Sequence, residues 1–171
     1  MRVEQRLAEL GLTLPDRVRL PPGTTISFAW ARMRGNRVFV SGHGALAADG
    51  SPAGPFGPVP SQVSLPQAQA SARLAGLAIL SSLKETLTDL DRVTAWLIVN
   101  GLVNADPGFP QTTSVLNSFS ELIIDLYGAD AGQHARTAIG VSALPLNLPV
   151  IISAEVEIDQ SGLADPGGAA G

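Results

Sequence analysis

A chain of 171 residues is long enough for one domain with a single core. Its 11 basic and 15 acidic residues leave a net charge of −4 and form no basic stripe, which excludes nucleic acid as the expected partner. With no cysteine, the chain cannot form disulfides, thiolate zinc sites or a cysteine nucleophile.

The N-terminal segment predicts a short amphipathic helix, because Val3, Leu7 and Leu10 recur at helical spacing. It lacks the apolar core of a signal peptide. The longest apolar run, LAGLAIL, is far shorter than the roughly 20 residues that span a bilayer. We therefore expect a cytoplasmic protein with no membrane partner and a helical extension over residues 1–14.

Residues 25–41 predict a β-hairpin. Ile26, Phe28 and Trp30 alternate as in a strand, and Arg34-Gly35-Asn36 predicts a tight turn into the returning strand RVFVSG. The next segment, 48–60, is crowded with glycine and proline and predicts a surface loop.

Two long helices are predicted after the hairpin. The sequence SLPQ at 64–67 is typical of a capping box, and small and apolar residues then recur at helical spacing to about residue 87. The second helix is expected over 112–127, and Gly128 is placed to end it. Asn117, Ser120 and Glu121 lie off its apolar stripe.

Three further strands are predicted. The first begins near residue 91 and is apolar on both sides, which favours a central position in the sheet. Its expected sides are Val93, Ala95, Leu97 and Val99 on one, and Trp96 and Ile98 on the other. Strands over 136–143 and 150–158 follow, and the tail 160–171 is expected to be flexible.

This order of elements predicts an α+β fold in which two long helices cover one face of a mixed sheet. The other face still carries apolar residues, which a monomer rarely leaves in water. We therefore expect a single domain over residues 1–159 whose open face is buried in a closed oligomer.

Arg136 is the strongest candidate for a functional residue, because it opens a segment that otherwise predicts a buried strand. A buried guanidinium requires an anion nearby, and its planar fork suits a carboxylate. The alternative is a salt bridge to Glu121 or Glu155, within the chain or between subunits.

A second candidate site is VSGHG at 40–44, where Ser41, Gly42, His43 and Gly44 expose backbone N–H groups suited to an oxygen anion. The same residues are also compatible with a bulge or turn. His43 and His134 are the only histidines, and their spacing is not that of zinc ligands, so no metal site is expected. The alternative for each histidine is a surface or packing residue without a role in chemistry. No nucleotide-binding motif is present, and no cofactor is expected.

Three segments resemble the Rid family of reactive-intermediate deaminases, also called the YjgF family and earlier labelled endoribonuclease L-PSP. HARTAIGVSALPLNLPV is similar to the family signature, in which an arginine opens a strand that closes on Leu-Pro. GNRVFVSGHGAL is similar to the family's turn and strand ending in Ser-Gly, and VLNSFSELIIDLYG resembles the helix whose asparagine faces the site. The resemblance covers about residues 28–158. The His-Ala-Arg spelling and the N-terminal helix indicate a longer, divergent branch.

This resemblance implies a chorismate-mutase-like fold and a homotrimer with sites between its subunits. Arg136 would bind a substrate carboxylate with help from the Gly42 backbone N–H, in a pocket lined by Phe28, Ser41 and Asn117. The implied activity is hydrolysis of a small imine or enamine, such as 2-aminoacrylate, to a 2-keto acid and ammonia. Correct orientation is sufficient for much of this chemistry, because imines already hydrolyse in water.

Two positions depart from the family pattern. The glutamate that holds the attacking water in many active members corresponds to Ile151, and the cysteine two residues after the arginine corresponds to Ala138. Since an apolar side chain cannot position water, His43 and His134 are the candidate bases. The alternative function is a non-catalytic trimer that binds a metabolite in the same cleft. A ribonuclease function finds no support in an acidic chain without a basic groove.

Overall fold

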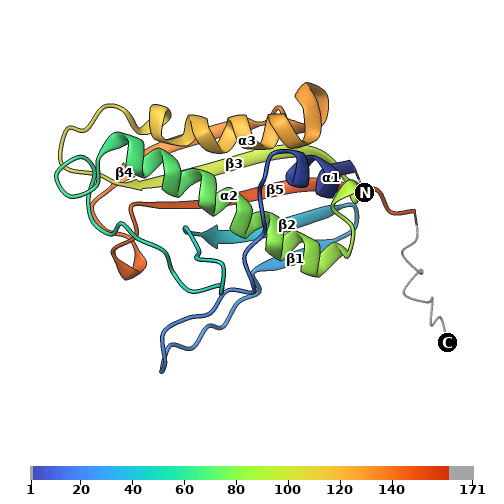
Figure 1. Ribbon diagram of the computed structural model, residues 1–171, viewed down its shortest axis with the longest axis horizontal. Helices are drawn as coiled ribbons and strands as arrows, with labels where there is room; N and C mark the ends of the chain where they lie inside the picture. Colours follow the sequence, from blue (N-terminus) through green and yellow to red (C-terminus); the bar gives the residue numbers. More distant parts are fainter. Residues whose placement is uncertain (1, 162–171) are drawn as a thin grey trace.

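A five-stranded mixed sheet forms the frame of the protein (Figure 1). The structure is a computed structural model that describes residues 2–161. Its strands are β1 (Ala31–Arg34), β2 (Arg37–His43), β3 (Val93–Asn104), β4 (Ala135–Val141) and β5 (Val150–Ile158). They lie in the order β1-β2-β5-β3-β4, and only β3 and β4 run parallel.

Two long helices, α2 (Leu65–Leu87) and α3 (Thr112–Gly132), lie side by side on one face of this sheet (Figure 1). A short helix α1 (Arg2–Glu9) packs at one end of the helical layer, and two 3-10 turns, η1 (Leu90–Arg92) and η2 (Pro145–Asn147), complete the regular structure. The predicted α+β class, with two helices on one face and a short N-terminal helix, is confirmed.

The start of α2 forms as the sequence predicts. The Ser64 backbone N–H donates to Gln67 Oε1 at 2.9 Å, and the Gln67 backbone N–H donates to Ser64 Oγ. This reciprocal capping box satisfies two N–H groups that have no partner within the helix. The small side chains of Ala68, Ala72 and Ala75 are fully buried, which allows the helix to lie close to the sheet.

Helix α3 continues five residues beyond the predicted end at residue 127. Gly128 adopts φ 79° and ψ 172°, which is neither helical nor the left-handed conformation of a helix cap, so it kinks the helix, and a further turn after it extends the element to Gly132. Gly101 on β3 allows α3 to approach the sheet closely, because a β-carbon there would lie 2.5 Å from Leu116 Cδ1.

The predicted hairpin begins later than expected, because β1 starts at Ala31 and residues 25–30 form no strand. The pairing of β2 with β5 shifts register between Val40 and His43, so the end of β2 bulges. Only one further backbone bond, from Ser41 N–H to the Trp30 carbonyl, extends the contact toward residue 30. Phe28 is left 53% exposed.

The predicted sides of β3 are wrong, although its interior position is correct. The register against β5 shifts between Val93 and Ala95 and again between Trp96 and Ile98. Each irregularity changes the alternation of side chains, so Trp96 points to the helical face together with Val93 and Val99. Its ring packs edge-on against Phe119, with the ring centroids 5.9 Å apart.

One continuous core lies between the sheet and the helices, and α1 contributes Val3 and Leu7 to it. None of the helices in residues 2–161 is long and apolar enough to cross a membrane. The predicted tail beyond residue 161 lies outside the described residues, so the domain limits stay a prediction.

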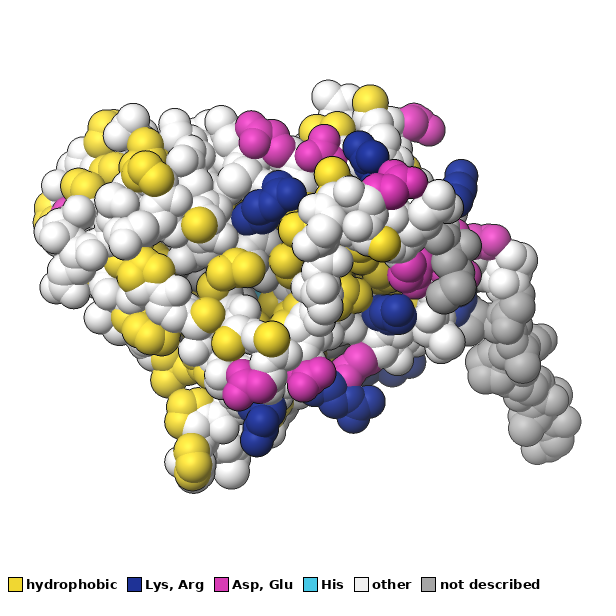
Figure 2. Space-filling model, viewed as in Figure 1, with side chains coloured by type: hydrophobic (Ala, Val, Ile, Leu, Met, Phe, Trp, Pro, Cys, Tyr) yellow, Lys and Arg dark blue, Asp and Glu magenta, His cyan; other side chains and the backbone are white. Residues whose placement is uncertain are grey.

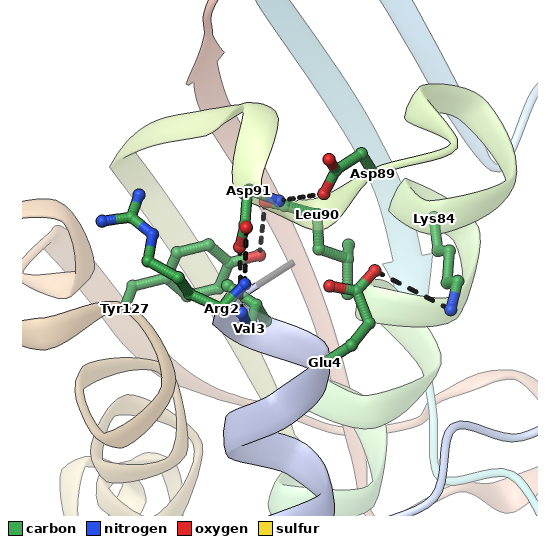
Figure 3. A network of polar contacts seen from close by, with 8 residues as sticks. All are labelled: Arg2, Val3, Glu4, Lys84, Asp89, Leu90, Asp91 and Tyr127. Atoms are coloured by element: carbon green, nitrogen blue, oxygen red, sulfur yellow. Dashed lines mark hydrogen bonds and ion pairs between the residues drawn. The ribbon is translucent and has the colours of Figure 1, made fainter.

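Helix α1 is held at its first turn by Asp91 of η1 (Figure 3). The backbone N–H groups of Arg2 and Val3 both donate to the Asp91 carboxylate, Val3 at 2.9 Å. Glu4 lies beside Lys84 of α2, with 3.8 Å between Oε1 and Nζ. A carboxylate at a helix N-terminus satisfies free donors and complements the helix dipole.

Replacing Asp91 with alanine should lower the free energy of unfolding by about 1 kcal/mol, as the loss of a helix cap usually does. Burial acts to raise the pKa of Asp91, and the backbone hydrogen bonds from Val3 and Arg2 are among the interactions that together lower it to about 2. This contribution is therefore present above about pH 4 and is lost as the pH falls toward 2. Urea unfolding at several pH values measures it, with the exposed Asp130→Ala on α3 as the control. A difference between Asp91→Ala and the wild type that does not shrink at low pH would contradict this account.

Candidate functional site

A cleft of about 430 Å³ lies between α3 and the edge strand β4. It contains Arg136 and His134, two residues that the sequence analysis singled out. Its lining residues are Thr113, Ser120, Ile124, Gln133, His134, Arg136 and Ala138.

The helical side of the cleft is a stripe of residues at helical spacing. Thr113, Asn117, Ser120 and Ile124 are separated by four, three and four positions, which places them on one side of α3. The fully buried residues of α3, such as Leu116 and Phe119, lie beside this stripe and fix its orientation toward β4.

The strand side of the cleft follows from the register of β4. Arg136 lies opposite Val99, which is fully buried beneath the helices, so the Arg136 side chain emerges on the helical face. Ala138, two residues on, points the same way and packs against the core. The neighbouring Ile139 is 48% exposed on the other face of the sheet.

Three uncharged acceptors hold the Arg136 guanidinium. Nη1 donates to Ser120 Oγ at 2.8 Å, and Nη2 donates to Asn117 Oδ1 at 3.0 Å and to the Thr113 carbonyl at 3.3 Å. These bonds fix the planar group at one wall of the cleft. Partial burial lowers the pKa of Arg136, which stays protonated at neutral pH.

No carboxylate neutralises Arg136 within residues 2–161. Glu155, one of the two partners considered from the sequence, pairs with Arg37 at 2.7 Å on the other side of the molecule's sheet. Glu121, the second, is exposed and forms no ion pair with Arg136. The salt-bridge alternative therefore fails within one chain, and the positive charge stays available to an external anion.

His134 completes a polar chain with Ser120. Its Nδ1 lies 2.8 Å from the Gly132 carbonyl, and its Nε2 lies 3.0 Å from Ser120 Oγ. A carbonyl only accepts, so the network assigns the ring hydrogen to Nδ1, and the Ser120 hydroxyl then donates to Nε2. Burial lowers the pKa of His134, the Gly132 carbonyl opposes this, and the charge of Arg136 lowers it further.

A second group of predicted site residues lies around the end of β2. Gly42 sits directly against Ile151 of β5, because a β-carbon at position 42 would be 2.7 Å from Ile151 Cγ2. Ser41 Oγ donates to the Ala29 carbonyl at 2.7 Å. Phe28 lies nearby in the chain, with its ring edge-on to Trp30 at 4.9 Å.

His43 belongs to the core, not to either group. It is 2% exposed, and its Nε2 lies 2.8 Å from Ser82 Oγ on α2. Its Nδ1 lies 2.7 Å from the Ser41 carbonyl, and burial lowers its pKa. Of the two histidines, only His134 reaches the Arg136 cleft.

Gly42 and Ile151 lie on the face of the sheet opposite to Arg136 within one chain. Ile152 and Ala154 of β5 are buried beneath the helices, so Ile151 between them points to the open face, away from Arg136. The cleft thus unites Arg136, Asn117, His134 and Ala138, whereas Phe28, Ser41, Gly42 and Ile151 lie elsewhere in the same chain.

The sequence prediction did not include Ser120, although Ser120 contacts both Arg136 and His134. Its signal is present in the chain as a polar stripe, Thr113, Asn117 and Ser120, beside the apolar stripe of a helix. The sequence alone does not show that β4 lies across this stripe, so it does not predict that these side chains line a cleft.

The described residues hold one cluster of carboxylates within reach of each other, Glu4, Asp89 and Asp91. It lies at the start of α1, where Asp91 caps the helix, and not in the Arg136 cleft (Figure 3). The cleft itself offers one imidazole and no carboxylate among its lining residues, which is a poor donor set for a metal ion.

No known family model matches this chain. The sequence is 32% identical over 158 residues to Protein TCP17 of Trypanosoma cruzi, covering 92% of this chain and 95% of that protein. The crystal structure of Atu1372 from Agrobacterium tumefaciens, whose function is unknown, is 35% identical and superposes with a TM-score of 0.81 over 92% of this chain and 94% of that one. A candidate endoribonuclease from Shewanella oneidensis shares the fold, with a TM-score of 0.83, 23% identity, and coverage of 92% of this chain and all of the other.

Both histidines should be neutral at pH 7 with the hydrogen on Nδ1. Imidazole ¹⁵N chemical shifts followed through a pH titration should place both midpoints below 6.5, since burial lowers both pKa values. Arg136→Gln should raise the midpoint of His134 only, because the arginine lies beside His134, and His43 serves as the internal control. A midpoint at or above 6.5 for His134, or a hydrogen on its Nε2, would contradict the assigned network.

Proposed function

Because this chain belongs to the YjgF/Rid family, also labelled endoribonuclease L-PSP, we propose that it hydrolyses small carboxylate-bearing imines or enamines. The expected substrates resemble 2-aminoacrylate, and the products are a 2-keto acid and ammonia. The observation that supports this proposal most is the Arg136 guanidinium, which is fixed by neutral acceptors and has no carboxylate partner in the described chain.

The chemistry of the cleft favours a small organic acid. A guanidinium attracts a carboxylate and donates hydrogen bonds to it, and a hydrogen bond to a charged group contributes about 1.5–3 kcal/mol. A volume of about 430 Å³ suits a molecule of a few heavy atoms with some water. Ala138 and Ile124 supply apolar surface beside the cation, which orients the rest of the substrate.

We propose in addition that the complete site forms between chains of a homotrimer. The open face of the sheet exposes Phe39, Ile98 and Ile139 at 45%, 45% and 48%, an apolar surface that an oligomer would bury. If that face of one chain lies against the Arg136 cleft of the next, Gly42 and Ser41 of one subunit can approach the arginine of another. This arrangement would explain why the two groups of predicted site residues lie apart within one chain.

The charge distribution gives nucleic acid no extended surface on the face seen in Figure 2. Basic and acidic side chains are intermixed toward the end that carries α1, and the opposite end is mainly apolar and neutral (Figure 2). Binding of RNA requires a continuous basic track. We therefore propose a small-molecule function, with non-catalytic metabolite binding as the alternative that the following experiment separates.

Arg136→Ala should remove the acceleration of ammonia release from freshly generated 2-aminoacrylate. Loss of the charged contact should also weaken binding of a 2-keto acid such as pyruvate by about 10- to 100-fold. Ammonia release above the protein-free rate and calorimetric binding of pyruvate measure the two effects. Arg136→Lys should recover part of the binding, because it keeps the charge without the planar fork.

Arg19→Ala is the matched control, since Arg19 is exposed, lies 3.9 Å from Asp49 and does not line the cleft. It should behave as the wild type. Binding of pyruvate without accelerated turnover would establish the binding module instead of the enzyme. Turnover that survives Arg136→Ala would exclude the Arg136 cleft as the site.

The assembly proposal has its own test in Ile98→Asp, which places a charge on the open face of the sheet. Because burying an unpaired carboxylate costs several kcal/mol, this variant should dissociate. Sedimentation velocity should give about three times the chain mass of 17.6 kDa for the wild type and the chain mass for the variant. Ala8→Asp, on the exposed side of α1, adds the same charge and should stay assembled. A wild type that sediments as a single chain would refute the trimer.

A further inference from the structure

We propose that Ser120 and His134 form a proton relay in the Arg136 cleft, in which the Ser120 hydroxyl holds the attacking water and His134 Nε2 receives the proton. This inference rests on the proposed imine hydrolysis and names the residues that activate water there. It makes Ser120 a catalytic residue that touches the reacting water, and His134 a residue that acts through it.

The geometry of the relay is continuous over three groups. The Gly132 carbonyl lies 2.8 Å from His134 Nδ1, and His134 Nε2 lies 3.0 Å from Ser120 Oγ. Both Ser120 and His134 line the cleft, so a bound water can reach the hydroxyl. A nucleophile or water activated by a base, which a third group orients, is the general arrangement of acid–base sites.

Ser120 does not behave as an ordinary helix serine. Such hydroxyls usually bond to a backbone carbonyl, as Thr86 does to Ser82 at 2.9 Å and Ser118 does to Gln69 at 2.6 Å. Ser120 instead contacts His134 and accepts from Arg136, with no carbonyl partner among the described residues. Its hydroxyl is thus directed away from the helix backbone and into the cleft.

Arg136 supports the relay electrostatically. Its Nη1 lies 2.8 Å from Ser120 Oγ, where a positive charge stabilises negative charge that develops on the oxygen. The same charge disfavours an imidazolium, so His134 stays neutral and able to accept a proton. Arg136 is the only charged side chain among the lining residues of the cleft, and the Phe119 ring packs edge-on to His134 at 5.9 Å.

The substrate enters as an iminium ion with its carboxylate on Arg136, and the water oxygen forms a bond to the iminium carbon while the C=N π electrons move to nitrogen. The water proton passes to Ser120 Oγ as the Ser120 proton passes to His134 Nε2. The relay then returns a proton to the amino nitrogen, the C–N bond breaks as the C=O bond forms, and the hydroxyl proton leaves with ammonia as ammonium.

The position of the relay accounts for the apolar residue on β5. Ile151 points to the open face of its own chain and cannot bind water, and His43 is 2% exposed and occupied by Ser82. Within the part of the chain that the structure describes, Ser120 and His134 are therefore the hydroxyl and imidazole beside the arginine that can pass a proton.

Two variants test the relay, Ser120→Ala and His134→Gln, with Ser118→Ala as the matched control on the same helix. Ser118 bonds to α2 and does not line the cleft. Both relay variants should lower kcat for 2-aminoacrylate hydrolysis by about 100-fold, the low end of general acid–base catalysis. Pyruvate affinity should stay within about threefold in His134→Gln, and in Ser120→Ala, which also removes an acceptor of Arg136, it should fall far less than kcat. The wild-type rate should fall as the pH drops through the lowered pKa of His134, and this dependence should be absent in His134→Gln.

The outcomes separate the relay from the proposed function. Full kcat and an unchanged pH profile in both variants, with Arg136→Ala inactive, would overturn the relay and leave the function standing. A parallel loss of pyruvate affinity and kcat in Ser120→Ala would also overturn it, because Ser120 would then only position Arg136. No acceleration by the wild type refutes the proposed function itself. Circular dichroism and unfolding curves for each variant separate misfolding from these effects.

Discussion

The site depends on one cation held by neutral groups. Three uncharged acceptors on α3 orient the Arg136 guanidinium, and within the described chain none of the carboxylates cancels its charge. Hydrogen bonds of this kind fix the geometry of a binding group before a ligand arrives, which reduces the entropy lost on binding. A glutamate at position 117 or 120 would fix the arginine equally well and would close the site to anions.

The cleft is a consequence of how the parallel pair of strands is connected. Parallel strands need a crossover, and here α3 supplies it between β3 and β4. The crossover lays the side of α3 that carries Asn117 and Ser120 across the edge strand that carries Arg136. Gly101 permits the close approach of α3 to β3 that this packing requires. The residues of the cleft are therefore brought together by one β-α-β unit, whereas Gly42 and Ile151 belong to the antiparallel part of the sheet.

The sequence predicts the helices better than it predicts the contacts between strands and helices. The capping box at Ser64 and the spacing of Val3 and Leu7 act locally, so they are visible in the chain and appear in the structure. The irregular pairing of β3 is set by contact with β5, and no local pattern reveals that Trp96 faces the helices. Ser120 escaped prediction for the same reason, since its contact with Arg136 depends on a strand 16 residues away. The separation of Ile151 from Arg136 likewise follows from strand order and not from any motif.

The contact between Gly42 and Ile151 ties two distant positions of the chain together. A β-carbon at 42 would lie 2.7 Å from Ile151 Cγ2, on neighbouring strands that otherwise pair regularly up to Val40. Any side chain at 42 must therefore be accompanied by a smaller or unbranched residue at 151. In an evolutionary series, positions 42 and 151 should change together. A branched aliphatic residue at position 151 should restrict position 42 to glycine.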